Sequence, residues 1–543
     1  NGGTLESIIG KGYTGGKKVD VTNLEDGDFF GRSISLNGTG DRLAVGAFRD
    51  DGAGNASSST GAAYLFSFAD ADFNGGILES TIGKGYTSGK NVDVTNLDGG
   101  VVGDLFGSSV SLNGAGDRLA VGARLDDGVG NAANRSGATY LFSFTDADFN
   151  GGTLESTIGK GYTSGKNVDV TNLEDGDKFG TSVSLNGAGD RLAVGASDDD
   201  GAGNAVSNSG AVTLFSFSDA DFNGGTLEST IGKGYTGGKN VDVTNLENID
   251  RFGRGVSLNA SGDRLAVGAF LDDGAGNVTG ESGAAYLLTF ADTDFNNGTL
   301  VSTIGKGYNN GNPKNINVGS LNSDTDDDEF GSSISLNGAG DRLAVGATDD
   351  DGAANVADRS GAAYLFSFTD TDFNGGTLES TIGSGYTGGK NVDVANLEGG
   401  GFSPGDSFGS SVSLNATGDR LAIGASIDDG AGNAAPASGA AYLFSFTDTN
   451  FNGGILESTI GAGYTSGKNL DVANLADNNE DYFGSGVSLN GAGDRLAVGA
   501  LNTNNTGAVY LFSFTDTDFN GGTLESTIGK GYTGGKNVDV ANL

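Results

Sequence analysis

The sequence repeats a short acidic motif whose side chains are of the kind that bind hard cations. The motif reads Asp-x-Asp-x-Asn-Gly and first occurs at Asp70, Asp72 and Asn74. Alternate oxygens at this spacing can surround a calcium ion, and glycine at the sixth position allows the sharp turn of such a loop. The candidate metal ligands in the complete copies are Asp70, Asp72, Asn74, Asp146, Asp148, Asn150, Asp219, Asp221, Asn223, Asp370, Asp372, Asn374, Asp516, Asp518 and Asn520. The motif predicts calcium at these turns, with an acidic hairpin turn that binds no ion as the alternative.

Several features of the motif favour the alternative. Phe73 occupies a position that is normally solvated in a calcium loop, and Glu79 falls at the tenth position of the loop rather than the twelfth. Two further copies are incomplete, because the copy at Asp292 lacks the glycine and the copy at Asp448 has asparagine at the third position. The spacing alone leaves both interpretations open.

A second acidic cluster, Asp50-Asp51-Gly-Ala-Gly-Asn55, is missing only from the last repeat unit. Its other copies begin at Asp126, Asp199, Asp272, Asp350 and Asp428. Because it falls between two predicted strands, we expect a solvated loop on one face of the protein. The alternative is cation binding between this loop and an aspartate of the Asp28 type, which stands two residues before each Phe-Gly pair.

The composition excludes several classes of site and partner. The chain has no Cys, His, Met or Trp, so thiol nucleophiles, imidazole bases, disulfides and the usual zinc sites are absent. A formal charge of −40 disfavours nucleic acid and anionic membranes and favours divalent cations as partners. No stretch approaches the roughly 18 apolar residues of a membrane span.

The elements that would position these residues are short β-strands in a tandem repeat. A chain of 543 residues exceeds the roughly 250–300 at which a single core stops growing, so repeated units or several domains are required. The segment Asn-Gly-Gly-Thr/Ile-Leu, with one variant, recurs at spacings of 68 to 78 residues. Within one unit, apolar runs and glycine turns predict four strands, at 109–113, 118–123, 138–144 and 153–158. Four strands per unit are typical of a propeller blade.

The unit resembles the FG-GAP repeat of integrin α-subunit propellers and related bacterial surface proteins. The resemblance rests on Asp104-Leu-Phe-Gly107, Leu119-Ala-Val-Gly-Ala123 and Gly137-Ala-Thr-Tyr-Leu-Phe142, and it covers nearly the whole chain. The Phe-Gly pair recurs at Phe30, Phe106, Phe179, Phe252, Phe330, Phe408 and Phe483. The resemblance implies a seven-bladed propeller, an extracellular location, roles in adhesion or ligand binding, and calcium in some blades.

The sequence departs from that family where its calcium loops lie, between the first and second strands. The corresponding turn is only Asn113-Gly-Ala-Gly-Asp117, which is too short and too poor in carboxylates to surround calcium. Calcium is therefore not expected at that turn, and the Asp70-type turns remain the candidate site.

The fold prediction is an all-β, seven-bladed β-propeller of four-stranded blades, with an open solenoid or fibre of the same repeats as the alternative. The fourth-strand segment occurs eight times, so one copy is surplus. Either copy could complete the last blade, which would leave the other free to pair with another molecule. The expected blades span residues 25–97, 98–173, 174–246, 247–320, 321–397, 398–475 and 476–543, preceded by an extra outer strand in 1–24.

The functional prediction is a secreted or cell-surface module that acts as an adhesive or structural surface and assembles end to end. Expected partners are other copies of the chain or a surface protein or glycan. Near-identical blades give repeated contacts, whereas a catalytic site is usually one irregular place, so we expect no enzyme. The alternative is a secreted propeller enzyme acting on polysaccharide, which would need two carboxylates at a defined separation.

Overall fold

The computed structural model describes most of the chain. The structure describes all residues except 1–5, 11–18, 22–23, 71, 101, 147, 220, 278–279, 310, 322–326, 399–404, 476–479, 517, 530–537 and 540–543. For residues 6–8, 10, 19–20, 525–529 and 538–539 the backbone alone is described. Much of the expected extra segment 1–24 therefore lies outside the described residues.

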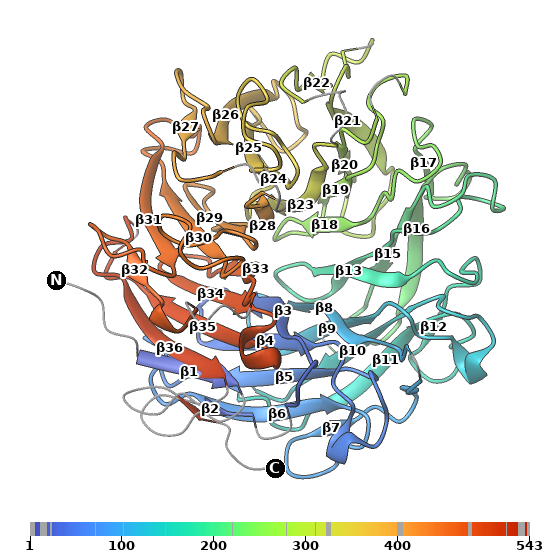
Figure 1. The fold of residues 1–543 in the computed structure, drawn as a ribbon. Coiled ribbons are helices and arrows are strands. Elements are labelled where there is room, and N and C mark those ends of the chain that lie inside the picture. The colour runs from blue at the N-terminus through green and yellow to red at the C-terminus, as the bar shows by residue number, and fades with distance from the viewer. Residues whose placement is uncertain are drawn as a thin grey trace.

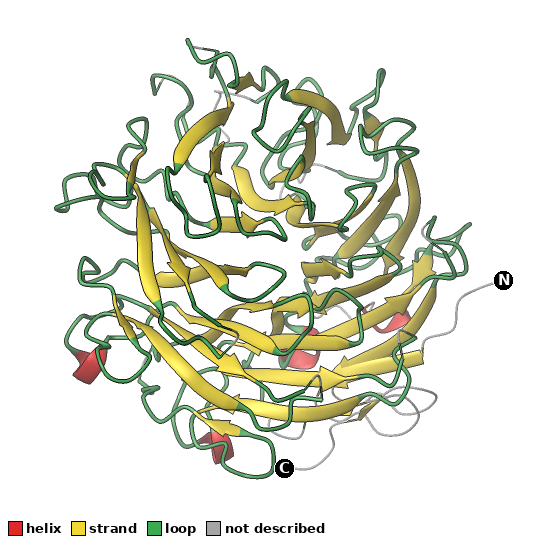
Figure 2. Cartoon of the chain, turned by 180° about the vertical axis from the view of Figure 1, so that it is seen from behind, coloured by secondary structure: helices red, strands yellow, loops and turns green. Residues whose placement is uncertain are grey.

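The described strands form seven sheets arranged as a ring (Figures 1 and 2). Blade 1 contains β3 (Phe30–Leu36), β4 (Arg42–Ala47), β5 (Ala62–Ser67), β6 (Ile77–Gly83) and β7 (Val92–Asp93). Blade 2 contains β8 (Phe106–Leu112), β9 (Arg118–Ala123), β10 (Ala138–Ser143), β11 (Thr153–Gly159) and β12 (Val168–Asp169). Blade 3 contains β13 (Phe179–Leu185), β14 (Arg191–Ala196), β15 (Ala211–Ser216), β16 (Thr226–Gly232) and β17 (Val241–Asp242). Blade 4 contains β18 (Gly255–Leu258), β19 (Arg264–Ala269), β20 (Ala284–Thr289), β21 (Thr299–Gly305) and β22 (Ile316–Asn317).

The remaining three blades repeat this order. Blade 5 contains β23 (Phe330–Leu336), β24 (Arg342–Ala347), β25 (Ala362–Ser367), β26 (Thr377–Gly383) and β27 (Val392–Asp393). Blade 6 contains β28 (Phe408–Leu414), β29 (Arg420–Ala425), β30 (Ala440–Ser445), β31 (Ile455–Gly461) and β32 (Leu470–Asp471). Blade 7 contains β33 (Phe483–Leu489), β34 (Arg495–Ala500), β35 (Ala508–Ser513), β36 (Thr523–Gly529) and β37 (Val538–Asp539), with β1 (Glu6–Gly10) and β2 (Val19–Asp20) in the same sheet. Short 3-10 turns at Ala53–Asn55, Val129–Asn131, Ala473–Leu475 and Thr503–Asn505 are the helical elements of the described residues.

The prediction of an all-β propeller with seven blades is confirmed. In each blade the first four strands are antiparallel, as in the order β8, β9, β10, β11. Outside them lies a fifth strand of two residues, such as β12, which pairs parallel to the fourth. The four-stranded prediction missed this strand because two residues carry no readable alternation.

The turn between the first two strands is built by one asparagine. The side-chain oxygen of Asn113 accepts hydrogen bonds from the backbone N–H groups of Gly116, Asp117 and Arg118, at 2.9, 3.0 and 3.1 Å. Gly116 has a φ of 78°, a conformation that glycine adopts without steric cost. The local sequence therefore specifies this hairpin without help from the rest of the fold.

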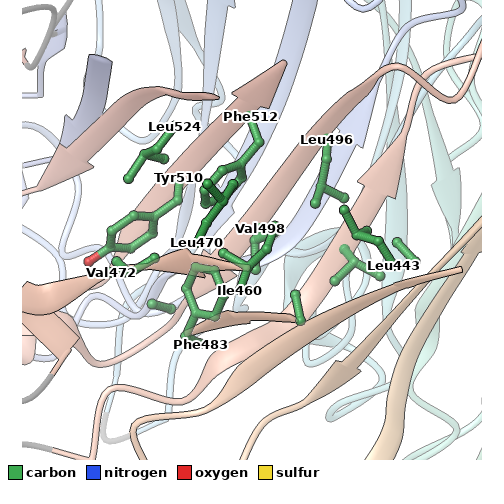
Figure 3. Close-up of a cluster of buried hydrophobic side chains, with 14 of the residues drawn as sticks. Leu443, Ile460, Leu470, Val472, Phe483, Leu496, Val498, Tyr510, Phe512 and Leu524 are labelled. Atoms are coloured by element: carbon green, nitrogen blue, oxygen red, sulfur yellow. The ribbon is translucent and has the colours of Figure 1, made fainter. Parts of the chain in front are cut away.

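The cores lie between blades. The cluster in Figure 3 joins Leu443 and Ile460 of blade 6 to Phe483, Val498 and Tyr510 of blade 7, all fully buried. Each blade is apolar on both faces of its second and third strands because it packs against two neighbours, and a single blade could not bury those faces.

Adjacent blades also meet backbone to backbone. A Cβ at Gly122, in the second strand of blade 2, would overlap the carbonyl oxygen of Gly180, the glycine of the next Phe-Gly pair. Gly180 itself has a φ of 89° and lies against the carbonyl oxygen of Ala138. The same pair recurs between blades 7 and 1, at Gly499 and Gly31. Glycine is therefore required at these positions by close packing between blades.

A ring of backbone hydrogen bonds closes the propeller. The first turn of each blade donates to the equivalent turn of the next, starting with the N–H of Gly38 to the oxygen of Gly114 at 3.1 Å. The series ends where the N–H of Gly491 donates to the oxygen of Gly38, at 3.0 Å. The chain thus forms a closed ring rather than the open solenoid that was the alternative.

The glycine contact between blades gives the first prediction. We expect Gly122→Ala to lower the free energy of unfolding by about 3 kcal/mol or more, because the methyl group would push two backbones apart. Circular dichroism during denaturant unfolding measures this. Gly319→Ala is the matched control, since a Cβ there would meet nothing closer than the side chain of Asn317, at 4.0 Å, and a change within about 0.5 kcal/mol is expected. An equal loss in both variants would contradict the close-packing role.

Candidate functional site

The structure places every predicted calcium ligand in the turn between the third and fourth strands. In blade 2, the side-chain N–H groups of Asn150 donate to both carboxylate oxygens of Asp146, at 3.0 and 2.8 Å. The backbone N–H groups of Asp148 and Asn150 donate to Asp146 as well, at 3.0 and 3.2 Å. These bonds lower the pKa of Asp146. The first aspartate therefore acts as the acceptor that holds its own turn.

The second aspartate of the motif joins neighbouring blades. Asp148 of blade 2 accepts a hydrogen bond from the guanidinium of Arg42 in blade 1, at 2.9 Å. Arg42 is 8% exposed and also donates to the backbone oxygens of Asp41 and Phe68, at 2.6 and 3.2 Å. The corresponding contact between blades 7 and 1 is Arg495 to Asp72, at 2.7 Å. In the turn that has Asn450 at this place, Arg342 donates to that side-chain oxygen instead, at 3.0 Å.

The turn geometry does not match a calcium site. The asparagine presents its amide nitrogen to the first aspartate, and the second aspartate binds arginine. Phe149, at the position that is solvated in calcium loops, is fully buried against Phe144 with ring centroids 5.0 Å apart. Among the residues that the structure describes, no group of three acidic side chains is placed to hold a metal ion. Calcium binding at these turns stays a prediction, and it would require the inter-blade arginine contacts to open.

The second acidic cluster differs from the solvated loop that we expected. Asp126 is 2% exposed and accepts hydrogen bonds from the hydroxyls of Tyr140, at 2.6 Å, and Tyr162, at 3.1 Å. The N–H of Gly128 donates to it at 2.8 Å. Only the outer part of the loop, such as Asn131, is exposed. The expectation was wrong for the first aspartate because the two tyrosines that bury it are distant in sequence.

A second buried carboxylate stands close to this network in each of blades 1 to 6. Asp104, two residues before the Phe-Gly pair, is 4% exposed and accepts a hydrogen bond from the N–H of Asp98 at 2.6 Å. Burial, with the negative charge of Asp126, raises the pKa of Asp104 to about 8. Burial also raises the pKa of Asp126, against the opposing effect of its tyrosine hydrogen bonds. Two carboxyl groups in one apolar site favour the protonated form of at least one.

The outer edge of blade 7 is shared by two copies of the fourth strand. β36 pairs with β35, with Thr527 opposite Tyr510. The first strand in the chain, β1, pairs with the same strand at the same place, with Ile8 also opposite Tyr510. The two copies lie parallel and in register with one another, and Figure 1 shows them side by side. One edge of β35 has a single set of hydrogen-bonding groups, so two copies compete for it.

The N-terminal copy supplies part of the core between blades 7 and 1. Ile9, Val21 and Leu24 are fully buried in that cluster, in the places that Ile82, Val94 and Leu97 hold between blades 1 and 2. Residue 24 leads directly into β3, so this segment is tied to the closing junction by the chain itself. The sequence shows that one strand copy is surplus but not which core it enters, because both copies are nearly identical.

The buried carboxylates predict an unusual dependence of stability on pH. A carboxyl group whose pKa is higher in the folded than in the unfolded state binds its proton more tightly when the chain is folded. Its contribution to the free energy of unfolding is therefore full below the pKa of the unfolded state and is lost as the pH rises through the pKa of the folded state. We expect the melting temperature to fall between pH 5 and pH 8 at constant ionic strength. Each such group lowers the free energy of unfolding by up to about 1.4 kcal/mol per pH unit in this range. Asp104→Asn should reduce this slope and the exposed control Asp175→Asn should not. A melting temperature that rises from pH 5 to pH 8 would contradict this account.

Comparison with known proteins agrees with this architecture. A scan against protein-family models matches the FG-GAP repeat at residues 22–66, 95–142, 246–288, 323–366 and 392–444. No curated protein matches the sequence. The match at 95–142 contains β8, β9 and β10, and thus the Phe-Gly and Gly-Ala positions at which blades meet. The chain contains five FG-GAP repeats and folds as a seven-bladed β-propeller.

Proposed function

We propose that the chain is a secreted or cell-surface binding module that also assembles with other copies of itself, rather than an enzyme. The observation that carries the assembly is the shared edge of blade 7, where two copies of one strand face the same residues of β35. A strand displaced from that edge keeps an unpaired row of N–H and C=O groups, which favours pairing with an equivalent edge elsewhere.

Other features support the surface role. FG-GAP repeats are typical of extracellular proteins, and a net charge of −40 keeps such a surface soluble and apart from anionic partners. No helix in the described part of the chain is long and apolar enough to cross a membrane. The binding proposal is preferred to polysaccharide hydrolysis because the described lining of the cavity between six of the blades contains one acidic side chain, that of Glu329, and glycoside hydrolysis generally uses two.

Strand exchange predicts that assembly requires both copies. We expect the full chain to form oligomers that grow with concentration, because a strand displaced in one molecule can pair with the vacated edge of another. A chain without residues 520–543 keeps one copy and should be a monomer, and so should a chain without residues 1–18. Light scattering coupled to size-exclusion chromatography measures the mass. Oligomers of unchanged size in either shortened chain, or a full chain that stays monomeric at all concentrations, would contradict strand exchange.

Calcium at the Asp70-type turns is proposed separately and has its own test. Binding to the folded state raises the melting temperature by mass action, so calcium should raise it more than an equal concentration of magnesium if the turns take the ion. Asp146→Asn should reduce the calcium effect, and the exposed control Asp175→Asn should leave it unchanged. A melting temperature that does not respond to calcium would leave these side chains with structural roles alone.

A further inference from the structure

The seven blades differ at two positions around the axis of the ring, here called the channel mouth. At the residue after each Phe-Gly pair, blades 1 and 4 have Arg32 and Arg254, and the other five have serine or threonine. At the residue after each Val/Ile-Gly-Ala, blades 1 and 4 have Phe48 and Phe270, blade 2 has Arg124, and the others have serine, threonine or leucine. The uniform repeat is thus interrupted at two positions, and the same two blades change at both.

These positions surround a cavity on the axis of the ring. The cavity has a volume of about 530 Å³ and is lined from six blades, among them by Arg32, Arg254, Phe270, Glu329 and Tyr482. Much of the remaining wall consists of serine and threonine hydroxyls. The size is within the usual range of small-ligand sites, and the lining offers hydrogen-bond donors and acceptors on several sides.

Aromatic rings hold the arginines in place. The guanidinium carbon of Arg254 lies 5.8 Å from the centre of the Phe270 ring, and that of Arg32 lies 5.8 Å from the centre of the Phe48 ring. Arg49 lies 4.9 Å from the centre of the Phe29 ring on the same side of blade 1. Attraction to the rings orients the guanidinium groups, and their N–H donors match the geometry of a carboxylate or sulfate.

The cations at the mouth divide into paired and unpaired groups. Lys178 and Arg251 both form ion pairs with Asp198. Among the described residues, Arg32, Arg124 and Arg254 form no ion pair. The arginines of the repeated Asp-Arg-Leu segment, in contrast, are paired in every blade with carboxylates.

The unpaired arginines lie close enough to repel one another. Burial, then the charges of Arg254 and Arg124, lowers the pKa of Arg32 to about 10, so it stays charged at neutral pH. Arg32 is exposed to the cavity and yet is surrounded by protein, which weakens solvent screening of that repulsion. Acidic side chains are abundant in this chain, but Glu329 is the one carboxylate among the described lining residues. Arginines that repel one another do not stabilise the fold, so their presence around one cavity is typical of a functional site.

We infer that the channel mouth binds an acidic saccharide, with the carboxylate or sulfate of the sugar between Arg32 and Arg254. The inference deepens the proposed binding function and rests on it, and it is independent of strand exchange. Charge-assisted hydrogen bonds from two oriented guanidinium groups would hold the anion. The serine and threonine hydroxyls of the wall would bond the hydroxyls of the sugar.

A saccharide fits this lining better than an acidic peptide. The cavity has few apolar side chains beyond its aromatic rings, so it offers little to bury the apolar parts of a peptide. It lies on the axis of the ring and is lined from six blades. An acidic sugar at the end of a chain can enter such a hollow while the rest of the glycan stays outside.

Isothermal titration calorimetry on the full chain tests the inference with four probes. These are a glucuronic acid oligosaccharide, a sulfated galactose oligosaccharide, uncharged maltotriose and a hexaglutamate peptide. We expect at least one of the two acidic sugars to bind and maltotriose and hexaglutamate not to bind. The double substitution Arg32→Gln and Arg254→Gln should weaken acidic-sugar binding at least tenfold. The exposed Arg135→Gln should leave it unchanged.

The melting temperature separates loss of the site from loss of the fold. The double variant removes the repulsion between Arg32 and Arg254 and also the attraction of Arg254 to Glu329 and Asp198, so it should melt close to the temperature of the unaltered chain while it loses binding. The inference is overturned if neither acidic sugar binds, if maltotriose or hexaglutamate binds as tightly, or if the double variant binds unchanged. Because assembly is measured by mass without ligand, failure of strand exchange would leave this result standing, and failure of sugar binding would leave strand exchange standing.

Discussion

The fold depends on the approach of two backbones at each junction between blades. The glycine of one Gly-Ala pair meets the carbonyl oxygen of the next Phe-Gly pair, as Gly122 meets Gly180, and a side chain at the first glycine would overlap that oxygen. The contact is repeated through to Gly499 and Gly31, where the last blade meets the first. This spacing brings the apolar faces of neighbouring blades together, and fully buried Phe side chains fill the space that remains at each junction, joined by a fully buried Tyr at every junction except that between blades 2 and 3.

Many of the carboxylates that suggest cation binding have structural roles in the ring. Asp146 holds its own turn, Asp148 binds an arginine of the preceding blade, and Asp126 accepts hydrogen bonds from two tyrosine hydroxyls. The first two roles recur around the ring, with Asn450 in place of the second aspartate in one turn, and a tyrosine hydroxyl bonds the buried aspartate in blades 1 to 6. These contacts give buried donors and acceptors a partner. A motif with calcium-like spacing can therefore arise from the needs of a turn and of its neighbour.

Function is proposed at the two places where the repetition fails. At the edge of blade 7 one strand is present in two copies, and at the channel mouth Arg32 and Arg254 replace the small hydroxyl side chains of other blades. The first concerns contacts between copies of the chain and the second concerns a small acidic ligand. Both are compatible in one molecule because the edge lies at the outside of the ring and the cavity lies on its axis.

The sequence by itself determined the strands, the hairpin turns and the number of blades. Apolar runs separated by glycine turns mark the first four strands of each blade, Asn113 caps its turn through neighbours three to five residues away, and the seven Phe-Gly pairs count the blades. These depend on local contacts, so spacing alone is enough to predict them. Only the tertiary structure decided that Arg42 reaches Asp148, 106 residues away, that Tyr162 buries Asp126, and that Arg32 and Arg254 line one cavity. Such partners are set by closure of the ring, which brings together positions whose separation in sequence carries no signal of their proximity.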